Sequence, residues 1–179
     1  MKKHSRDPAG PTEASDPVAV ARAICLRLLA ARPQSRAELV TALCQRGIPN
    51  DAVGAALDRL EDVGLVDDAA FAEVAVHSGH TYRGLGRHAL SAELRRRGVS
   101  GEIARDAVAA VEPQDEERQA RELVQRKLRS TTVSDETTTV RRIVGTLARK
   151  GYPEELALRV VREEVRAVTG VDPSLPGLG

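Results

Sequence analysis

The stretch Leu90-Ser91-Ala92-Glu93-Leu94-Arg95-Arg96-Arg97-Gly98-Val99 decides the fold, because its pattern occurs three times in the chain. The other copies are Leu39-Val40-Thr41-Ala42-Leu43-Cys44-Gln45-Arg46-Gly47-Ile48 and Ile143-Val144-Gly145-Thr146-Leu147-Ala148-Arg149-Lys150-Gly151-Tyr152. Each copy has two apolar residues four apart, then a basic residue, a glycine and a further apolar residue. The three glycines are 51 and 53 residues apart, which is typical of one supersecondary unit used three times.

The repeated pattern predicts a helix that ends at the glycine. Apolar residues four apart lie on one face of a helix, and a basic residue near its end suits the negative end of the helix dipole. Glycine just past the end supplies the left-handed turn that closes a helix. A second helix is expected to start a few residues later, at Asn50, Ser100 and Pro153, where apolar residues again recur at helical spacing.

A third helix is expected before each pair, and the sequence shows no convincing strand alternation. These first helices are predicted over residues 17–31, 67–80 and 114–129. Ser35 and Glu38 have the spacing of a capping box. The predicted fold class is therefore all-α, with three tandem three-helix repeats that stack into an elongated, gently curved molecule.

The repeats are predicted over residues 17–66, 67–112 and 113–168. The polar ends, residues 1–16 and 169–179, are expected to be disordered tails.

The composition excludes several classes of protein. There are 27 basic and 26 acidic residues, so the net charge of +1 argues against a histone-like polycation, although a local basic patch remains open. Cys25 and Cys44 make neither a disulfide framework nor a four-ligand zinc site, and we expect two small buried residues in a reducing compartment. The apolar-rich stretch from Val18 to Ala31 contains two arginines and is too short to cross a bilayer. A cytoplasmic protein without membrane contact is predicted.

The residues that resemble chemical motifs have simpler explanations. Gly84-Leu85-Gly86-Arg87-His88-Ala89 matches a loose dinucleotide pattern, but a helix rather than a strand is predicted before it, which favours a flexible turn. Glu73, His77 and His80 share a helix face but lack a fourth metal ligand. The carboxylate pairs Asp67-Asp68 and Glu154-Glu155 stand at helix starts, where acidic groups complement the dipole. No catalytic residue, cofactor or metal is expected, and the protein is not predicted to be an enzyme.

The basic residues are the candidates for binding a partner. If the repeats stack regularly, the basic helix ends line up along one face, which suits an acidic protein surface or a phosphate backbone. An ordinary solvated helix end is the alternative. Arg46 occupies this position in the first repeat. The candidate partner-binding residues are Arg83, Arg87, Arg95, Arg96, Arg97, Arg149 and Lys150.

Several of these segments resemble the RecX family, which restrains the RecA recombinase. The resemblance rests on Gly64–Ala72, on Gly84–Gly86 followed by Ala92–Val99, on Asp115-Glu116 with Ala120–Leu128, and on Leu147–Tyr152. It covers roughly residues 18–166. Family members often carry a Trp near Ala75 and an Arg near Gly79, so partner affinity could differ here.

The resemblance implies tandem three-helix repeats and a regulatory function. It implies binding along the groove of a RecA filament on single-stranded DNA, with lower ATP hydrolysis and strand exchange. We expect a monomer that has RecA as its partner and at most a weak contact with DNA. A direct nucleic-acid-binding helical module is the alternative, since three-helix units can place a helix in the major groove, and a generic helical scaffold is the fallback.

Overall fold

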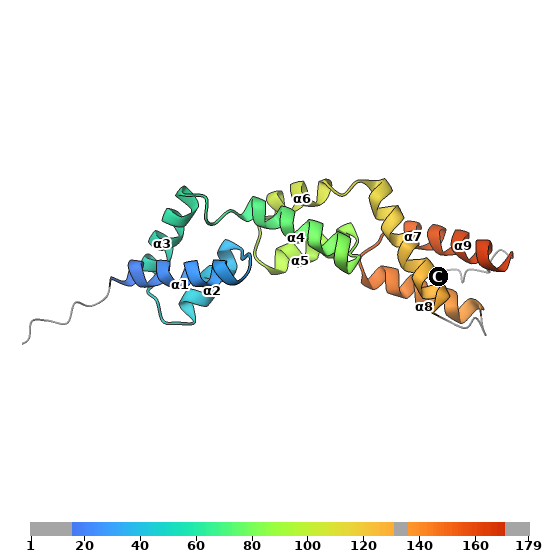
Figure 1. Cartoon of the computed structure of the whole chain (residues 1–179), viewed down its shortest axis with the longest axis horizontal. Helices are drawn as coiled ribbons and strands as arrows, with labels where there is room; N and C mark the ends of the chain where they lie inside the picture. Colours follow the sequence, from blue (N-terminus) through green and yellow to red (C-terminus); the bar gives the residue numbers. More distant parts are fainter. Residues whose placement is uncertain (1–15, 131–135, 171–179) are drawn as a thin grey trace, which may run out of the picture. The chain divides into compact units, whose positions relative to one another are not determined.

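The computed structural model describes residues 16–130 and 136–170, and these residues form nine α-helices and no strand (Figure 1). The predicted all-α class is confirmed. In chain order the helices are α1 (Pro17–Ala31), α2 (Arg36–Cys44), α3 (Asn50–Asp62), α4 (Asp68–Arg83), α5 (Arg87–Arg96), α6 (Gly101–Ala109), α7 (Pro113–Arg129), α8 (Glu136–Arg149) and α9 (Glu154–Thr169). Of the predicted tails, residues 1–15 and 171–179 lie outside the described residues.

The repeated glycines close α2, α5 and α8 in the same way. Gly47, Gly98 and Gly151 have φ angles of +75°, +77° and +80°. The amide of the residue after each glycine donates to the carbonyl five residues back: Ile48 to Leu43, Val99 to Leu94, and Tyr152 to Leu147. This bond satisfies a carbonyl that the end of the helix would leave unpaired. The predicted glycine-ended helices are therefore confirmed.

Side chains that accept amide hydrogen bonds fix where several helices begin. Ser35 and Glu38 form the predicted capping box at α2, with hydrogen bonds of 3.1 and 3.0 Å. Ser100 accepts from the Ile103 amide at the start of α6. Asp67 accepts from two amides at the start of α4, which confirms the structural role predicted for the Asp67-Asp68 pair.

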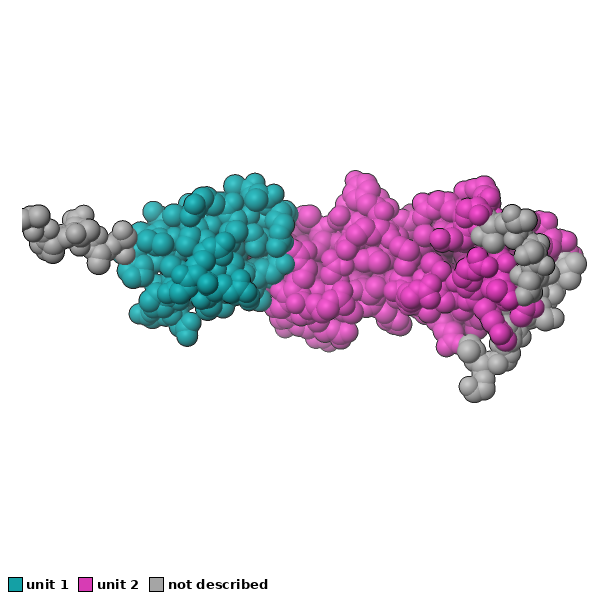
Figure 2. Space-filling view, turned by 90° about the horizontal axis from the view of Figure 1, so that it is seen from below, with its two compact units in different colours: residues 1–66 teal, residues 67–179 magenta. Residues whose placement is uncertain are grey.

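The chain divides into two compact units, one ending at Val66 and one beginning at Asp67 (Figure 2). In unit 1, α1 packs on α2 and α3 around a core that includes Leu39, Leu43 and Leu57. Cys25 belongs to this core, but Cys44 is exposed, so the expectation of two buried cysteines is wrong for the second. Cys44 is the last residue of α2, and its Sγ lies 3.6 Å from Asn50 Oδ1 instead of facing the core.

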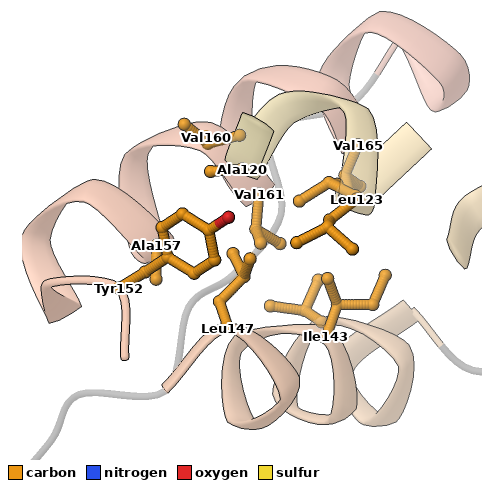
Figure 3. Packing of buried hydrophobic residues seen from close by; sticks show 11 residues of the cluster. Ala120, Leu123, Ile143, Leu147, Tyr152, Ala157, Val160, Val161 and Val165 are labelled. Atoms are coloured by element: carbon orange, nitrogen blue, oxygen red, sulfur yellow. The ribbon is translucent and has the colours of Figure 1, made fainter. Parts of the chain in front are cut away.

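Unit 2 contains the other two helical triads, and each triad has its own core. Around Phe71, Leu90 and Leu94, helix α4 packs on α5 and α6. Helix α9 packs on α7 and α8 around Leu147 and Val161, as Figure 3 shows. Since each core is small, contacts between the two triads of unit 2 add to its stability.

Candidate partner-binding site

The turn between α4 and α5 is held by the end of α8. Gly84 ends α4 with φ +60°, and Gly86 is the residue just before α5. The amide of Gly86 donates to the Lys150 carbonyl at 2.8 Å, and the amide of His88 donates to the Gly151 carbonyl at 3.2 Å. The turn predicted for the G-x-G segment is therefore present, and helices rather than strands flank it. Main-chain hydrogen bonds hold this turn against the end of α8.

The two glycines at this junction allow the backbones to approach closely. A β-carbon placed on Gly86 would lie 2.6 Å from the Gly151 carbonyl oxygen. One placed on Gly151 would lie 2.2 Å from the Ala89 nitrogen. Neither overlap involves a flexible side-chain end that could move away. The glycines therefore fix how the second and third triads meet.

Side chains from the third triad complete the junction. Gly86 has no side chain to cap α5, and Glu116 of α7 takes this role, since its Oε1 accepts from the Arg87 amide at 2.8 Å. The Glu116 side chain is buried, and its negative charge faces the positive end of the α5 dipole. The Tyr152 hydroxyl donates to the Gly84 carbonyl at 3.1 Å. Burial and the neighbouring Glu116 carboxylate raise the pKa of Tyr152, so this donor keeps its proton.

Four basic residues lie close together at the same junction, near the ends of α4, α7 and α8. They are Arg83, Arg126, Lys127 and Lys150. The Lys150 ammonium, at the end of α8, donates to the Arg83 carbonyl at the end of α4. Partial burial lowers the pKa of Lys150, and the nearby charges of Arg126, Arg83 and Lys127 lower it further. Like charges that perturb one another create a positive field that favours an anionic group.

Arg126 and Lys127 were not among the residues predicted from the sequence. The available signal was the basic last turn of α7, which carries the same kind of residues as the helix ends that were singled out. Neither side chain has an ion pair within residues 16–130 and 136–170, so both positive charges remain available to a partner.

The predicted basic residues fall into two groups. Arg83, Arg87, Arg149 and Lys150 lie at the junction, since α5 begins where α8 ends. Arg95 and Arg96 are exposed at the other end of α5, and Arg97 lies over the Phe71 ring at 4.3 Å. The nine residue steps of α5 put about 13 Å between the two groups.

Not all of these charges are equally available to a partner. The Arg83 guanidinium makes two contacts of 2.9 Å with the Glu93 carboxylate. Arg149 is exposed and donates to the Thr146 hydroxyl at 3.2 Å. Arg95 and Arg96 have no ion pair within the described part of the chain, which makes them the most available of the predicted cations.

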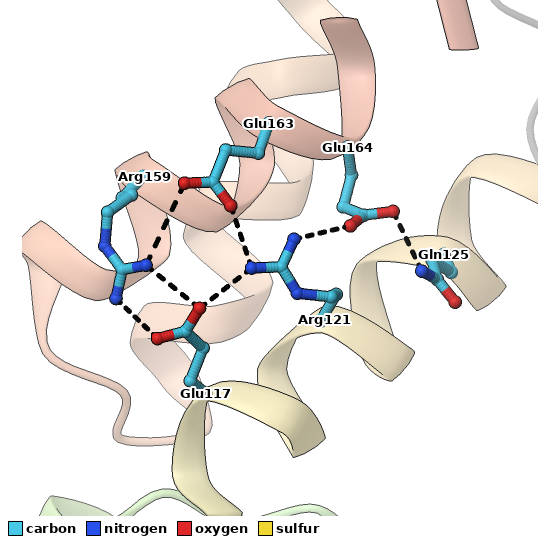
Figure 4. Close-up of polar contacts among 6 residues, drawn as sticks. All are labelled: Glu117, Arg121, Gln125, Arg159, Glu163 and Glu164. Carbon is cyan, nitrogen blue, oxygen red and sulfur yellow. Dashed lines mark hydrogen bonds and ion pairs between the residues drawn. The ribbon is translucent and has the colours of Figure 1, made fainter. Parts of the chain in front are cut away.

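Another group of charged side chains on α7 and α9 is neutralised by ion pairs within the group (Figure 4). Arg121 makes ion pairs of 2.8 Å with Glu117, Glu163 and Glu164. Arg159 also pairs with Glu117 at 2.8 Å. The hydrogen bonds from Arg159 and Arg121 lower the pKa of Glu117 to about 2. This network joins α7 to α9 and leaves little unpaired charge for a partner.

The described residues offer no metal site. Glu73, His77 and His80 lie on α4 beside a groove, but within residues 16–130 and 136–170 no three His, Cys, Asp or Glu side chains are placed to hold a metal ion. Helices long and apolar enough to cross a membrane are also absent from the described ranges.

Comparison with known proteins accounts for the three triads. Family models for the first, second and third three-helix domains of RecX match residues 21–60, 67–108 and 115–161. The regulatory protein RecX of Thermobifida fusca is 50% identical over 169 residues, which cover 94% of this chain and 91% of that protein. The chain belongs to the RecX family. The resemblance noted in the sequence is therefore confirmed.

Further comparisons agree with this assignment. The regulatory protein RecX of Streptomyces coelicolor is 51% identical over 148 residues, covering 83% of this chain and 79% of that protein. RecX from Lactobacillus salivarius has a crystal structure that matches with a TM-score of 0.72 at 18% identity, over 83% of this chain and 97% of that one. The structural match supports the fold alone. The sequence matches assign the chain to a family of regulatory proteins rather than of enzymes.

Proposed function

We propose that this RecX protein binds RecA and its filament on single-stranded DNA and lowers ATP hydrolysis and strand exchange. It thereby modulates recombination and DNA repair. The observation that carries the proposal is the 50% identity to a regulatory RecX protein over 94% of the chain. The partner follows from the family resemblance of the sequence.

The surface charges of unit 2 support a partner that carries negative charge. Arg95 and Arg96 are exposed and without ion pairs in the described ranges, and Arg126 and Lys127 are similarly available. Charges of this kind speed the encounter with an oppositely charged partner, and salt weakens their effect.

The direct test is the ATPase activity of RecA on single-stranded DNA. Added at less than one molecule per RecA, the protein should lower the hydrolysis rate, and the protein alone should hydrolyse nothing. An unchanged rate over a wide range of protein concentration would contradict the proposed function.

A double variant tests whether the basic end of α5 takes part. Arg95→Glu with Arg96→Glu should fold, because both side chains are exposed, and should lower the apparent affinity for RecA at least about tenfold. Arg97 is left unchanged because it packs on Phe71. The matched control is Arg22→Glu with Arg27→Glu, which changes the net charge equally at exposed positions of α1. Equal inhibition by the two double variants would mean that Arg95 and Arg96 are only a solvated helix end.

Direct nucleic-acid binding is the second candidate, and the gathering of Arg83, Arg126, Lys127 and Lys150 favours it. A salt titration of binding to naked single-stranded DNA distinguishes the two. Strong binding whose affinity falls steeply with salt concentration favours the hypothesis of direct nucleic-acid binding, because each neutralised phosphate releases counterions. Binding that requires RecA and nucleotide favours the regulator.

A further inference from the structure

Unit 2 has a groove of about 600 Å³ between α4, α6 and the start of α7. Its floor is apolar and is formed by Val76, Ile103, Ala107 and Val111. This volume is in the range of sites that bury a ligand, which runs from about 300 to 1,000 Å³. The groove is separate from the basic residues discussed above, none of which lines it.

The charge of this groove is negative. Glu73 of α4 and Asp106 of α6 line it, are exposed, and have no ion pair within residues 16–130 and 136–170. Asp115 also lines it, but its carboxylate is paired with Arg118 at 2.7 Å. Two carboxylates above an apolar floor favour an occupant that is apolar and carries positive charge.

Two large apolar side chains of α4 are also exposed close to the groove-lining residues in sequence. Val74 is 56% exposed and Tyr82 is 78% exposed. His77 lines the groove and contacts the Tyr82 ring edge-to-face, with 6.3 Å between ring centroids. Exposed aromatic and apolar groups beside a groove are typical of surfaces that bind another protein.

The dimensions fit a helix. The residues of α4 that line the groove run from Ala69 to Thr81, about 18 Å along the helix axis, which equals about three turns of a partner helix. The described residues contain no strand, so they offer no sheet edge to which an extended peptide could add. An amphipathic helix lying in a groove between helices is a common mode of recognition that suits this length and this apolar floor.

We propose that this groove binds a basic amphipathic helix of the protein partner. The apolar face of that helix packs on Val76, Ala107 and Val111, and its cations face Glu73 and Asp106. The inference rests on the proposed function in that RecA is the partner. RecX then presents two surfaces of opposite sign, a basic one at α5 and an acidic groove at α4 and α6, and each selects its own part of the partner.

A matched pair of variants at the end of α6, whose last residue is Ala109, tests the groove. Ala110 lines the groove and is exposed, so Ala110→Trp fills the groove without entering the core. Ala109 is the preceding residue, also exposed, but does not line the groove, so Ala109→Trp is the control. Binding to RecA is measured by fluorescence anisotropy with a dye on the exposed Cys44. Ala110→Trp should weaken binding at least about tenfold, and Ala109→Trp less than about twofold.

Charge variants at exposed positions give a second test that does not depend on a large new side chain. Glu73→Gln with Asp106→Asn should weaken binding to RecA several-fold. Arg118→Gln should strengthen it, because it releases the Asp115 carboxylate and makes the groove more negative. Tighter binding by the first variant and weaker binding by the second would overturn the assignment of a basic occupant.

The outcomes separate this inference from the proposed function. If the unmodified protein does not bind RecA, both fail. If it binds RecA and the two Trp variants bind equally well, only the groove assignment fails. Sedimentation of the free protein tests whether a second copy of this chain fills the groove instead. A dimer that Ala110→Trp dissociates and Ala109→Trp does not would mean that a second copy fills the groove, which also overturns the proposal.

Discussion

Replacing Gly151 with alanine should separate the second and third triads of unit 2. The new β-carbon would lie 2.2 Å from the Ala89 nitrogen and 2.5 Å from the Ala89 β-carbon. Non-bonded atoms cannot approach this closely, and the Ala89 nitrogen belongs to the main chain of α5, which cannot turn aside as a side chain could. The backbones must therefore move apart, which breaks the hydrogen bonds from Gly86 to Lys150 and from His88 to Gly151.

The size of the effect follows from two contributions. An alanine at the φ of +80° observed for Gly151 costs about 1 kcal/mol in backbone strain. Each lost hydrogen bond costs about 1 kcal/mol, so the free energy of unfolding of unit 2 should fall by about 3 kcal/mol. The result should be a unit 2 that unfolds at a clearly lower urea concentration.

Gly47 supplies the control that isolates the contact. It occupies the equivalent helix end in unit 1 with φ +75°, but a β-carbon there would meet nothing within 4 Å. Gly47→Ala should therefore cost only the backbone contribution, about 1 kcal/mol. Both variants can be followed by urea unfolding with circular dichroism. Tyrosine fluorescence reports on unit 2 alone, since Tyr82 and Tyr152 are the only tyrosines.

Amide exchange provides a local readout of the same event. The Gly86 and His88 amides should exchange faster in Gly151→Ala and remain unchanged in Gly47→Ala, because only the first variant breaks their hydrogen bonds. If Gly151→Ala costs no more than Gly47→Ala, and both amides stay protected, then the close approach of the two triads does not stabilise the junction.

Three further variants test other parts of the structure. The ion pairs of Glu117 lower its pKa to about 2, against an ordinary value of about 4.3. They stabilise the fold fully at pH values above about 4.3, and this stabilisation is lost as the pH falls toward 2. Glu117→Gln should therefore have a lower melting temperature than the unmodified protein at about pH 5, and the difference should shrink toward about pH 2; a constant difference would contradict the assignment. Leu94→Asp places a carboxylate where the leucine is 1% exposed, so urea unfolding should show a loss of at least about 3 kcal/mol, whereas stability like that of the unmodified protein would mean that the register of α5 is wrong. Asp67→Ala removes the side chain that accepts two amide bonds of 2.9 Å and should cost about 1 kcal/mol, while Asp62→Ala, at the exposed end of α3, should leave urea unfolding unchanged.

The local elements could be predicted from the sequence because their causes are local. The helix ends at Gly47, Gly98 and Gly151 depend on a glycine and the five residues before it, and all three copies make the same hydrogen bond. The Ser35 cap and the burial of Leu94 likewise follow from residues within one or two helical turns. Each of these predictions uses a pattern that the chain repeats or that stands in consecutive positions.

The junction could not be predicted because its contacts join distant parts of the chain. The Glu116 carboxylate caps a helix that begins 29 residues earlier, and the Tyr152 hydroxyl bonds a carbonyl 68 residues away. Sequence spacing gives no sign of either contact. The approach of Arg87 to Lys150 has the same kind of cause, since main-chain hydrogen bonds from Gly86 to Lys150 and from His88 to Gly151 join the start of α5 to the end of α8.

Separation of charge, rather than the net charge of +1, determines what unit 2 offers to a partner. The cations Arg121 and Arg159 are matched by glutamates across α7 and α9, so they contribute to packing more than to the external field. Arg95 and Arg96 on α5, and Glu73 and Asp106 in the groove, have no such matching within the described residues. Exposed charges of this kind are screened over about 8 Å at physiological salt, while the partly buried network is screened less. If the proposed surfaces bind the partner, raising the salt concentration should therefore weaken partner binding well before it weakens the fold, because the exposed charges and the stabilising ion pairs are different sets of residues.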